Sequence, residues 1–171
     1  MTPGASAVTV RRAVTADVAV IHDLVQEYAG DGQRLLKKNL VTLYEDVQEF
    51  VVAETGGVVV GCGALHVLWQ DLAEIRTVAV RGDAQHAGIG SAILRELISQ
   101  ARALGLKRLF CLTFAISFFE AHGFIEIEGT PVEPEVYQEL LASYDQGVAE
   151  FLDLEYVKPN TLGNNRMLLV L

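Results

Sequence analysis

The segment TVAVRGDAQHAGIGSAILREL, residues 77–97, decides the fold of this chain. It begins with a β-branched run that is typical of a strand, and a polar turn with two glycines follows. Apolar residues then recur at helical spacing from Ile89 onward, which predicts an amphipathic helix. Glycine-containing joints between a strand and a helix commonly hold phosphate. No lysine stands in residues 85–90, so a phosphate here would depend on main-chain amides.

Composition sets the class of protein. The chain has 171 residues, 51% of them hydrophobic, and we expect one domain over 1–171, with its core at about 8–127 and a C-terminal helix and strand at 130–171. The net charge of −9 argues against nucleic acid or an anionic membrane as the main partner. The two cysteines form no CxxC pair, and neither a signal peptide nor a membrane-spanning run is visible. These features predict a cytoplasmic protein with reduced thiols.

The pattern of elements predicts an α/β fold. Strands are expected at 8–13, 49–54, 58–68, 72–80, 108–113 and 166–171, and helices at 15–30, 41–47, 89–104, 116–123 and 134–147. Thr15 can cap the first helix, Thr55-Gly56-Gly57 is typical of a hairpin turn, and Gly105 is expected to end the helix at 89–104. Residues 148–157 can be a strand or a loop. Side-chain alternation puts Glu74, Arg76, Val78 and Val80 on one face of their strand. The fold class is therefore a mixed, mostly antiparallel central sheet flanked by helices, with one strand–helix–strand crossover.

Three kinds of phosphate loop compete for residues 85–91. A P-loop requires Lys after its second glycine, whereas Gly90 is followed by Ser91. A dinucleotide fingerprint requires a third glycine where this chain has Ile93. The pattern Gln/Arg-x-x-Gly-x-Gly/Ala is met by Gln85, Gly88 and Gly90.

This pattern and its surroundings resemble the GCN5-related N-acetyltransferases. The stretch VAVRGDAQHAGIGSAILRELISQARALGLKRLF resembles their acetyl-CoA-binding motif, and FFEAHGF resembles their aromatic-aromatic-x-x-x-Gly-Phe element. The resemblance covers roughly residues 8–127 and implies a sheet splayed at the acetyl-CoA site. It also implies that acetyl-CoA is the co-substrate, bound by a strand end and a loop: Val78, Ala79, Val80, Arg81, Gln85, His86, Ala87, Gly88, Ile89, Gly90 and Ser91.

A closer resemblance is to the acetyltransferase domain of N-acetylglutamate synthases, in the short, stand-alone actinobacterial form without an amino-acid-kinase domain. The resemblance rests on five stretches: RLLKKNL, EIRTVAV, LFCLT, FFEAHGF and NNRMLLVL. It implies that the acceptor is L-glutamate or L-glutamine and that the reaction begins arginine biosynthesis. An acidic protein needs local cations to bind an amino-acid carboxylate, and the candidates are Arg34, Lys37, Lys38 and Arg76. Two alternatives stay open: Arg34, Lys37 and Lys38 can form a solvated helix start, and Arg76 can pair with Glu74.

Acetyl transfer requires a neutral amine, which a general base must supply at neutral pH. Glu74 lies where family members often carry this base, and an ion-pair role is the alternative. The oxyanion would accept a hydrogen bond from a main-chain N–H, which we assign to Val78. The aromatic pair Phe118 and Phe119 lacks the tyrosine that many relatives use to protonate the thiolate. Ser117, a water molecule or release of the bare thiolate can replace it.

Cys111 lies in an apolar run that disfavours a nucleophilic thiolate. His, Asp and Glu do not cluster at metal-ligand spacing, so we expect no metal. Two other classes of function stay open: acetylation of another amine, such as a protein N-terminus, an aminoglycoside or a polyamine, and a non-catalytic acyl-CoA sensor. The expected partner is a small-molecule substrate, and a homodimer is left open.

Overall fold

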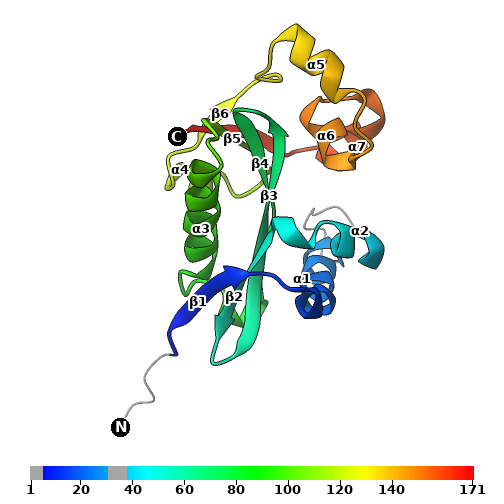
Figure 1. Ribbon diagram of the computed structural model, residues 1–171. Helices are drawn as coiled ribbons and strands as arrows, with labels where there is room; N and C mark the ends of the chain where they lie inside the picture. The colour runs from blue at the N-terminus through cyan, green and yellow to red at the C-terminus, as the bar shows by residue number, and fades with distance from the viewer. Residues whose placement is uncertain (1–5, 31–37) are drawn as a thin grey trace. The chain divides into compact units, whose positions relative to one another are not determined.

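The computed structural model describes residues 6–30 and 38–171. The chain forms two compact units, Met1–Leu65 with Ile75–Gln100, and His66–Glu74 with Ala101–Leu171. Two long strands, β3 (Val58–Trp69) and β4 (Leu72–Val80), contribute residues to both units. Figure 1 labels the α-helices and the strands β1 to β6.

The strands pair in the order β1-β2-β3-β4-β5-β7-β6. Pairing is antiparallel between β1 and β2, β2 and β3, β5 and β7, and β6 and β7, whereas β4 and β5 are parallel. The prediction of a mixed, mostly antiparallel sheet with one crossover is therefore confirmed. The remaining strands are β1 (Val8–Arg12), β2 (Phe50–Thr55), β5 (Arg108–Thr113), β6 (Ile125–Ile127) and β7 (Asn165–Val170).

In the first unit, two helices cover one face of the strands. Apolar residues of α1 (Val18–Gly30) and α2 (Leu40–Glu45) form a buried cluster with Phe50, Val52, Cys62 and Ala64. The turn between β2 and β3 has Gly56 and Gly57 at φ of 58° and 79°, the left-handed pair that a two-residue hairpin favours. The predicted hairpin is confirmed.

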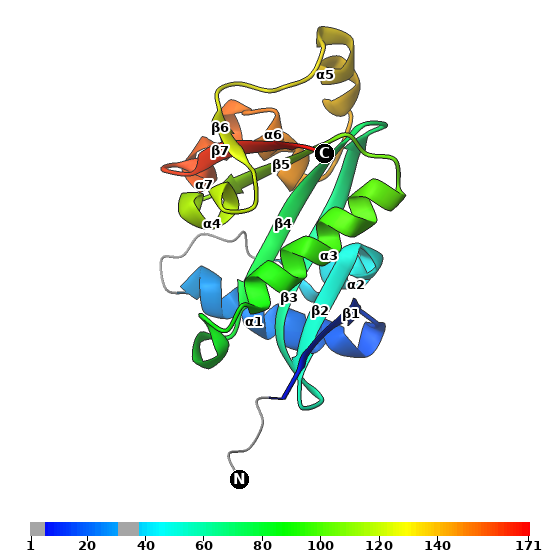
Figure 2. The same ribbon diagram turned by 90° about the vertical axis from the view of Figure 1, so that its left-hand side faces the viewer.

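The opposite face of β3 receives α3 (Ile89–Ala103), as Figure 2 shows. Gly61 and Gly63 alternate with Cys62 and Ala64, so they face the helix. A Cβ at Gly63 would lie 2.7 Å from Ile93 Cγ2, and one at Gly61 would lie 2.9 Å from Ile93 Cδ1. The missing side chains therefore let the helix approach the strand closely, and this contact fixes the position of the helix.

The start of α1 and the end of α3 differ in part from the prediction. Thr15 does not cap the first helix; it begins the 3-10 turn η1 (Thr15–Asp17), where Asp17 Oδ2 accepts from the Val14 N–H at 2.8 Å. The Arg11 guanidinium donates two hydrogen bonds to Asp17, which lowers the pKa of that carboxyl. Gly105 (φ 84°) follows the end of α3 as predicted, but the helix stops at Ala103, and Leu104 is 63% exposed.

The second unit packs helices on β5 and β7. Phe110 of β5 meets Phe151 of α6 (Gln146–Phe151) edge-on, with 4.9 Å between ring centroids. Residues 134–147, predicted as one helix, divide into α5 (Pro134–Leu140) and the start of α6, and residues 148–157 are mostly helical rather than strand or loop. The other short elements are η2 (Val47–Glu49), η3 (Gly82–Ala84), α4 (Ile116–Glu120), η4 (Glu155–Val157) and α7 (Lys158–Thr161).

Candidate active site

The loop between β4 and α3 presents its backbone to solvent. Residues 85–88 are exposed, and His86 and Gly88 take left-handed φ values of 64° and 77°. A Cβ at Gly88 would meet nothing within 4 Å, so the space in front of this residue is open. Glycine is favoured here by the backbone angle, and its lack of a side chain leaves room for a ligand to approach the main chain.

The first turn of α3 follows at once. The first four N–H groups of a helix have no acceptor inside the helix, and its N-terminus carries partial positive charge. Ile89 is 3% exposed and its Cγ2 atom would lie 3.2 Å from a Cβ at Gly61. Packing therefore holds the helix start in place, and its amides can bind an anion without a lysine.

Side chains near the loop are already engaged with protein groups. Arg81 Nε lies 2.5 Å from Asp83 Oδ1, and the Arg81 N–H donates to Val60 O at 2.8 Å. The Gln85 side-chain amide donates to Val80 O at 3.3 Å and ties the loop to the strand end. The positive charge of Arg81 is thus compensated locally, which makes the main chain the stronger candidate for binding an anion here.

Side-chain alternation in β4 breaks at Thr77, which has φ of 56° inside the strand. Ala79 belongs to the apolar cluster with α1, whereas Val78 Cγ2 lies 3.4 Å from a Cβ built at Gly63, on the α3 side. The prediction that Glu74, Arg76, Val78 and Val80 share one face is therefore wrong beyond Thr77. A left-handed residue in a strand acts like a β-bulge and redirects the N–H groups that follow it.

Glu74 is buried, with 5% of its surface exposed. It pairs with Phe110 in the β4–β5 register, and Leu112 pairs with Arg166 in the β5–β7 register. Paired residues point to the same side of a sheet and alternate residues share a face, so these four side chains line one face of the second unit. Burial raises the pKa of Cys111, and the charge of Glu74 raises it further, which disfavours an acyl-carrier thiolate.

The other predicted catalytic residue, Ser117, is exposed on α4. The neighbouring rings of Phe118 and Phe119 lie 5.1 Å apart, and Phe118 also lies 5.1 Å from the ring of His122. These contacts explain the aromatic pair as packing, and the roles of Glu74 and Ser117 stay predictions.

The predicted basic residues are placed only in part. Arg34 and Lys37 lie outside the described residues. Lys38 is held within the first unit, with its Nζ atom 3.9 Å from Asp46 Oδ2 and 5.9 Å from the centre of the Phe50 ring. Arg76 is buried, with 9% of its surface exposed. Substrate binding by these residues stays a prediction.

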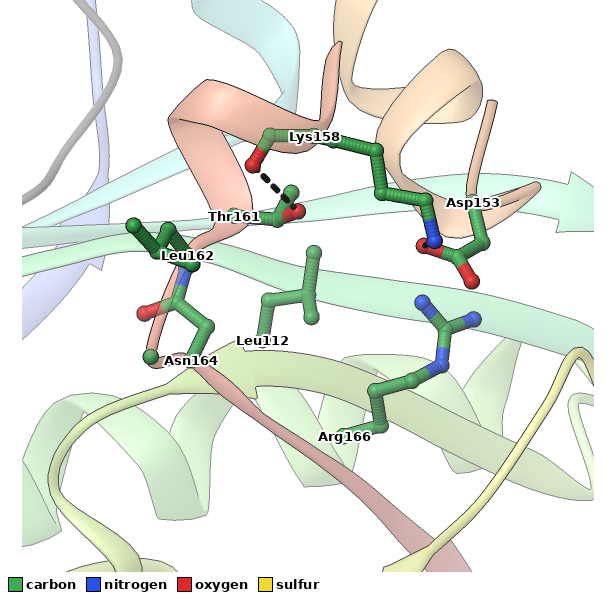
Figure 3. Close-up of a pocket in the computed structure, with 8 residues that line it drawn as sticks. Leu112, Asp153, Lys158, Thr161, Leu162, Asn164 and Arg166 are labelled. Atoms are coloured by element: carbon green, nitrogen blue, oxygen red, sulfur yellow. Dashed lines mark hydrogen bonds and ion pairs between the residues drawn. The ribbon is translucent and has the colours of Figure 1, made fainter. Parts of the chain in front are cut away.

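Sequence reasoning did not single out a pocket of about 260 Å³ in the second unit, shown in Figure 3. Lys158 Nζ lies 2.9 Å from Asp153 Oδ1, and the Arg166 side chain points toward the same carboxylate. The amide oxygen of Asn164 is buried and has no hydrogen-bond partner among the described residues. The pocket is lined by Leu112, Asp153, Lys158, Thr161, Leu162, Gly163, Asn164 and Arg166.

Arg166 is fixed by its surroundings. It donates to the carbonyl oxygens of Gly129, Glu150 and Phe151 at 2.8, 3.3 and 2.5 Å, and it stacks 4.8 Å from the centre of the Phe110 ring. Burial lowers its pKa, while Asp153 and Glu74 act in the opposite direction. The guanidinium thus forms a rigid wall of the pocket. Arg166 stands in the closing segment NNRMLLVL, but a single arginine near the start of a terminal strand has no spacing that marks it as a site residue.

Comparison with known proteins agrees with this geometry. The sequence profile of the Acetyltransferase (GNAT) family matches residues 18–124. The chain belongs to this family. An amino-acid acetyltransferase of Mycobacterium tuberculosis is 64% identical over 165 residues, which cover 95% of this chain and 94% of the relative.

Two solved structures resemble the acetyltransferase closely. A Mycobacterium tuberculosis protein in complex with CoA and NLQ has a TM-score of 0.92 and 63% identity, with 95% of this chain and 99% of that chain covered. N-acetylglutamate synthase from Neisseria gonorrhoeae, complexed with coenzyme A and N-acetyl-glutamate, has a TM-score of 0.76 and 25% identity. The match covers 97% of this chain and 35% of the synthase.

The predictions of family, fold class and co-substrate are therefore confirmed, and the chain is an acetyl-CoA-dependent amino-acid N-acetyltransferase. No helix in residues 6–30 or 38–171 is long and apolar enough to cross a membrane. Within the same residues, no group of three or more His, Cys, Asp or Glu side chains could hold a metal ion.

Gly88→Glu should weaken CoA binding, because it adds a negative charge and a strained side chain where a diphosphate would meet the main chain. Strain of about 1–2 kcal/mol and a similar charge repulsion give a loss of roughly thirtyfold or more, measured by calorimetry. Gly57→Glu is a matched control, because Gly57 has φ of 79° and open space around its Cβ position. Equal CoA affinity in the two variants would contradict the site.

Proposed function

We propose that this acetyltransferase transfers the acetyl group of acetyl-CoA to the α-amino group of L-glutamate or L-glutamine. With glutamate, this reaction begins arginine biosynthesis. The observation that carries the choice of acceptor is the pocket containing Lys158, Arg166 and Asn164 on the sheet face that also bears Glu74. The name of the Mycobacterium relative supports an amino-acid acceptor, and that of the Neisseria N-acetylglutamate synthase supports glutamate.

The pocket can bind either side chain through different groups. The ammonium of Lys158 and the guanidinium of Arg166 attract a carboxylate. The buried Asn164 amide oxygen is an acceptor and needs a donor, which the carboxamide of glutamine supplies and a carboxylate does not. This oxygen is the specific observation that supports glutamine as the second acceptor.

Catalysis would proceed by direct attack. Glu74 accepts the proton of the acceptor ammonium, directly or through water, and its burial keeps it away from competing bulk solvent. The neutral amine then attacks the thioester carbonyl. The Val78 N–H, which follows the break in β4 at Thr77, donates a hydrogen bond to the oxyanion. Collapse of the tetrahedral intermediate breaks the C–S bond and expels the CoA thiolate, and the nitrogen loses its second proton to water to give the amide. The thiolate takes a proton from Ser117 or from water, or leaves unprotonated.

The cofactor would be held mainly by main-chain groups. The amides at the start of α3 bind the diphosphate, and the strand end from Val78 to Arg81 offers main-chain groups to the pantetheine arm. Lys38, Arg76, Arg34 and Lys37 remain candidates for the acceptor carboxylates. We further propose that residues 1–171 act as one domain, in the cytoplasm, and a homodimer remains open to test.

Two other functions compete. Polyamine and aminoglycoside acceptors are cations, and sites for them are rich in carboxylates, whereas the described pocket carries two basic side chains and one acidic one. A non-catalytic acyl-CoA sensor would explain the absence of tyrosine from the Phe118–Phe119 pair. The buried Glu74 argues against that alternative, because a sensor needs no base.

A thiol-release assay with acetyl-CoA and a panel of amines separates these functions. We expect CoA release with L-glutamate and L-glutamine and little with spermidine, an aminoglycoside or a peptide N-terminus. Release only with basic amines would contradict the proposal, and CoA binding without release for any amine would favour a sensor.

Glu74→Gln should reduce kcat by roughly a hundredfold at pH 7, because the bound ammonium would lose its proton acceptor. The defect should shrink as the pH rises above about 9, where the free amine becomes abundant without help. The kcat–pH profile measures this. A loss that is uniform across pH would assign Glu74 a structural role instead.

A further inference from the structure

We propose that Asp153 is a specificity-determining residue that opposes binding of a carboxylate in the Lys158–Arg166 pocket and so favours a carboxamide acceptor. This inference rests on the proposed function, in which the pocket receives the side chain of glutamate or glutamine. Asp153 lines the pocket and lies 2.9 Å from the ammonium of Lys158 (Figure 3).

The backbone position of Asp153 is one that glycine or asparagine fills more often than aspartate. The Leu154 N–H donates to Ala149 O at 3.2 Å, and the Asp153 N–H donates to Glu150 O at 3.1 Å. These two bonds form a Schellman motif that ends α6, with Asp153 at the left-handed position (φ 60°) that glycine or asparagine usually fills. An anionic side chain at a helix C-terminus also faces the negative end of the helix dipole.

Local structure therefore does not explain the carboxylate. Glycine or asparagine would satisfy the same backbone with less strain and without the repulsion from the helix end. The exposed ion pair with Lys158 offers little stability in return, since such pairs contribute roughly 0–1 kcal/mol. A residue that conflicts with its local structure is often retained for its chemistry, and here that chemistry is the charge inside the pocket.

The cations of the pocket are largely committed before an acceptor arrives. Lys158 is paired with Asp153, and three carbonyl oxygens already accept from the Arg166 guanidinium. A carboxylate entering the pocket would compete with Asp153 for Lys158 and be repelled by its charge. A carboxamide carries no charge, so the Asp153 carboxylate does not repel it, and its NH₂ group can donate a hydrogen bond to Asp153.

Asp153→Asn tests this directly, since asparagine suits the left-handed backbone and removes only the charge. A unit charge roughly 7 Å away at an effective dielectric constant of about 40 changes binding about sevenfold. We expect the ratio of kcat/KM for L-glutamate over L-glutamine to rise roughly three- to thirtyfold. Lys158→Gln should move the ratio in the opposite direction. Glu155→Gln, an exposed residue outside the pocket, is the charge-matched control and should leave the ratio unchanged.

Calorimetric binding of both amino acids in the presence of CoA separates this inference from the proposed function. A gain of glutamate affinity in Asp153→Asn, with glutamine affinity nearly constant, supports the role of Asp153 even if turnover is absent. Turnover of both amino acids with an unchanged ratio and unchanged affinities would overturn the inference and leave the proposed function standing. Wild-type protein that neither binds nor acetylates them would overturn both.

Discussion

The close packing of α3 against Gly61 and Gly63 of β3 is the contact on which the proposed cofactor site depends. Ile89 and Ile93 occupy the space that side chains at these glycines would fill. Because Ile89 is the first residue of α3, the same contact fixes where the amides of the first turn point. Ligand binding through main-chain groups requires such fixed geometry, since a backbone amide cannot adjust as a long side chain can.

The proposed cofactor site binds a diphosphate, and the proposed acceptor pocket distinguishes a carboxylate from a carboxamide. The net charge of the protein is −9, yet neither site relies on free surface cations. At the cofactor loop, Arg81 is compensated by Asp83, and helix amides supply the positive potential. In the second unit, Lys158 is compensated by Asp153, and Arg166 is held by carbonyl oxygens. Cations that are neutralised locally let a site select a ligand by hydrogen bonding as well as by charge.

The sequence predicted the fold well where a local signal decided the structure. The hairpin at Gly56 and Gly57, the strand–loop–helix around Gly88 and the stop at Gly105 each follow from glycine chemistry and side-chain spacing. Prediction failed where tertiary contacts decide. Thr77 is a β-branched residue, a type that favours regular strands, so its left-handed φ could not be foreseen. The prediction that Glu74 and Val78 share one face was therefore wrong.

The same limit applies to the candidate site. The cofactor motif is continuous in sequence, whereas the pocket unites Leu112 with residues 153–166, and no spacing rule connects them. The β5–β7 register places Arg166 in the pocket, and the end of α6 places Asp153 there, so neither position follows from the sequence alone. The sequence instead predicts substrate binding by basic residues that stand close together, such as Lys37 and Lys38.

The most direct test of the central claim is an NMR titration of ¹⁵N-labelled protein with CoA and, separately, with pantetheine, which lacks the diphosphate. If amides at the start of α3 hold the diphosphate, CoA should shift the resonances of Gly88, Ile89, Gly90 and Ser91 strongly, and pantetheine should leave them nearly unchanged. Equal shifts with both ligands, or no shift at these amides when CoA is bound, would contradict the account.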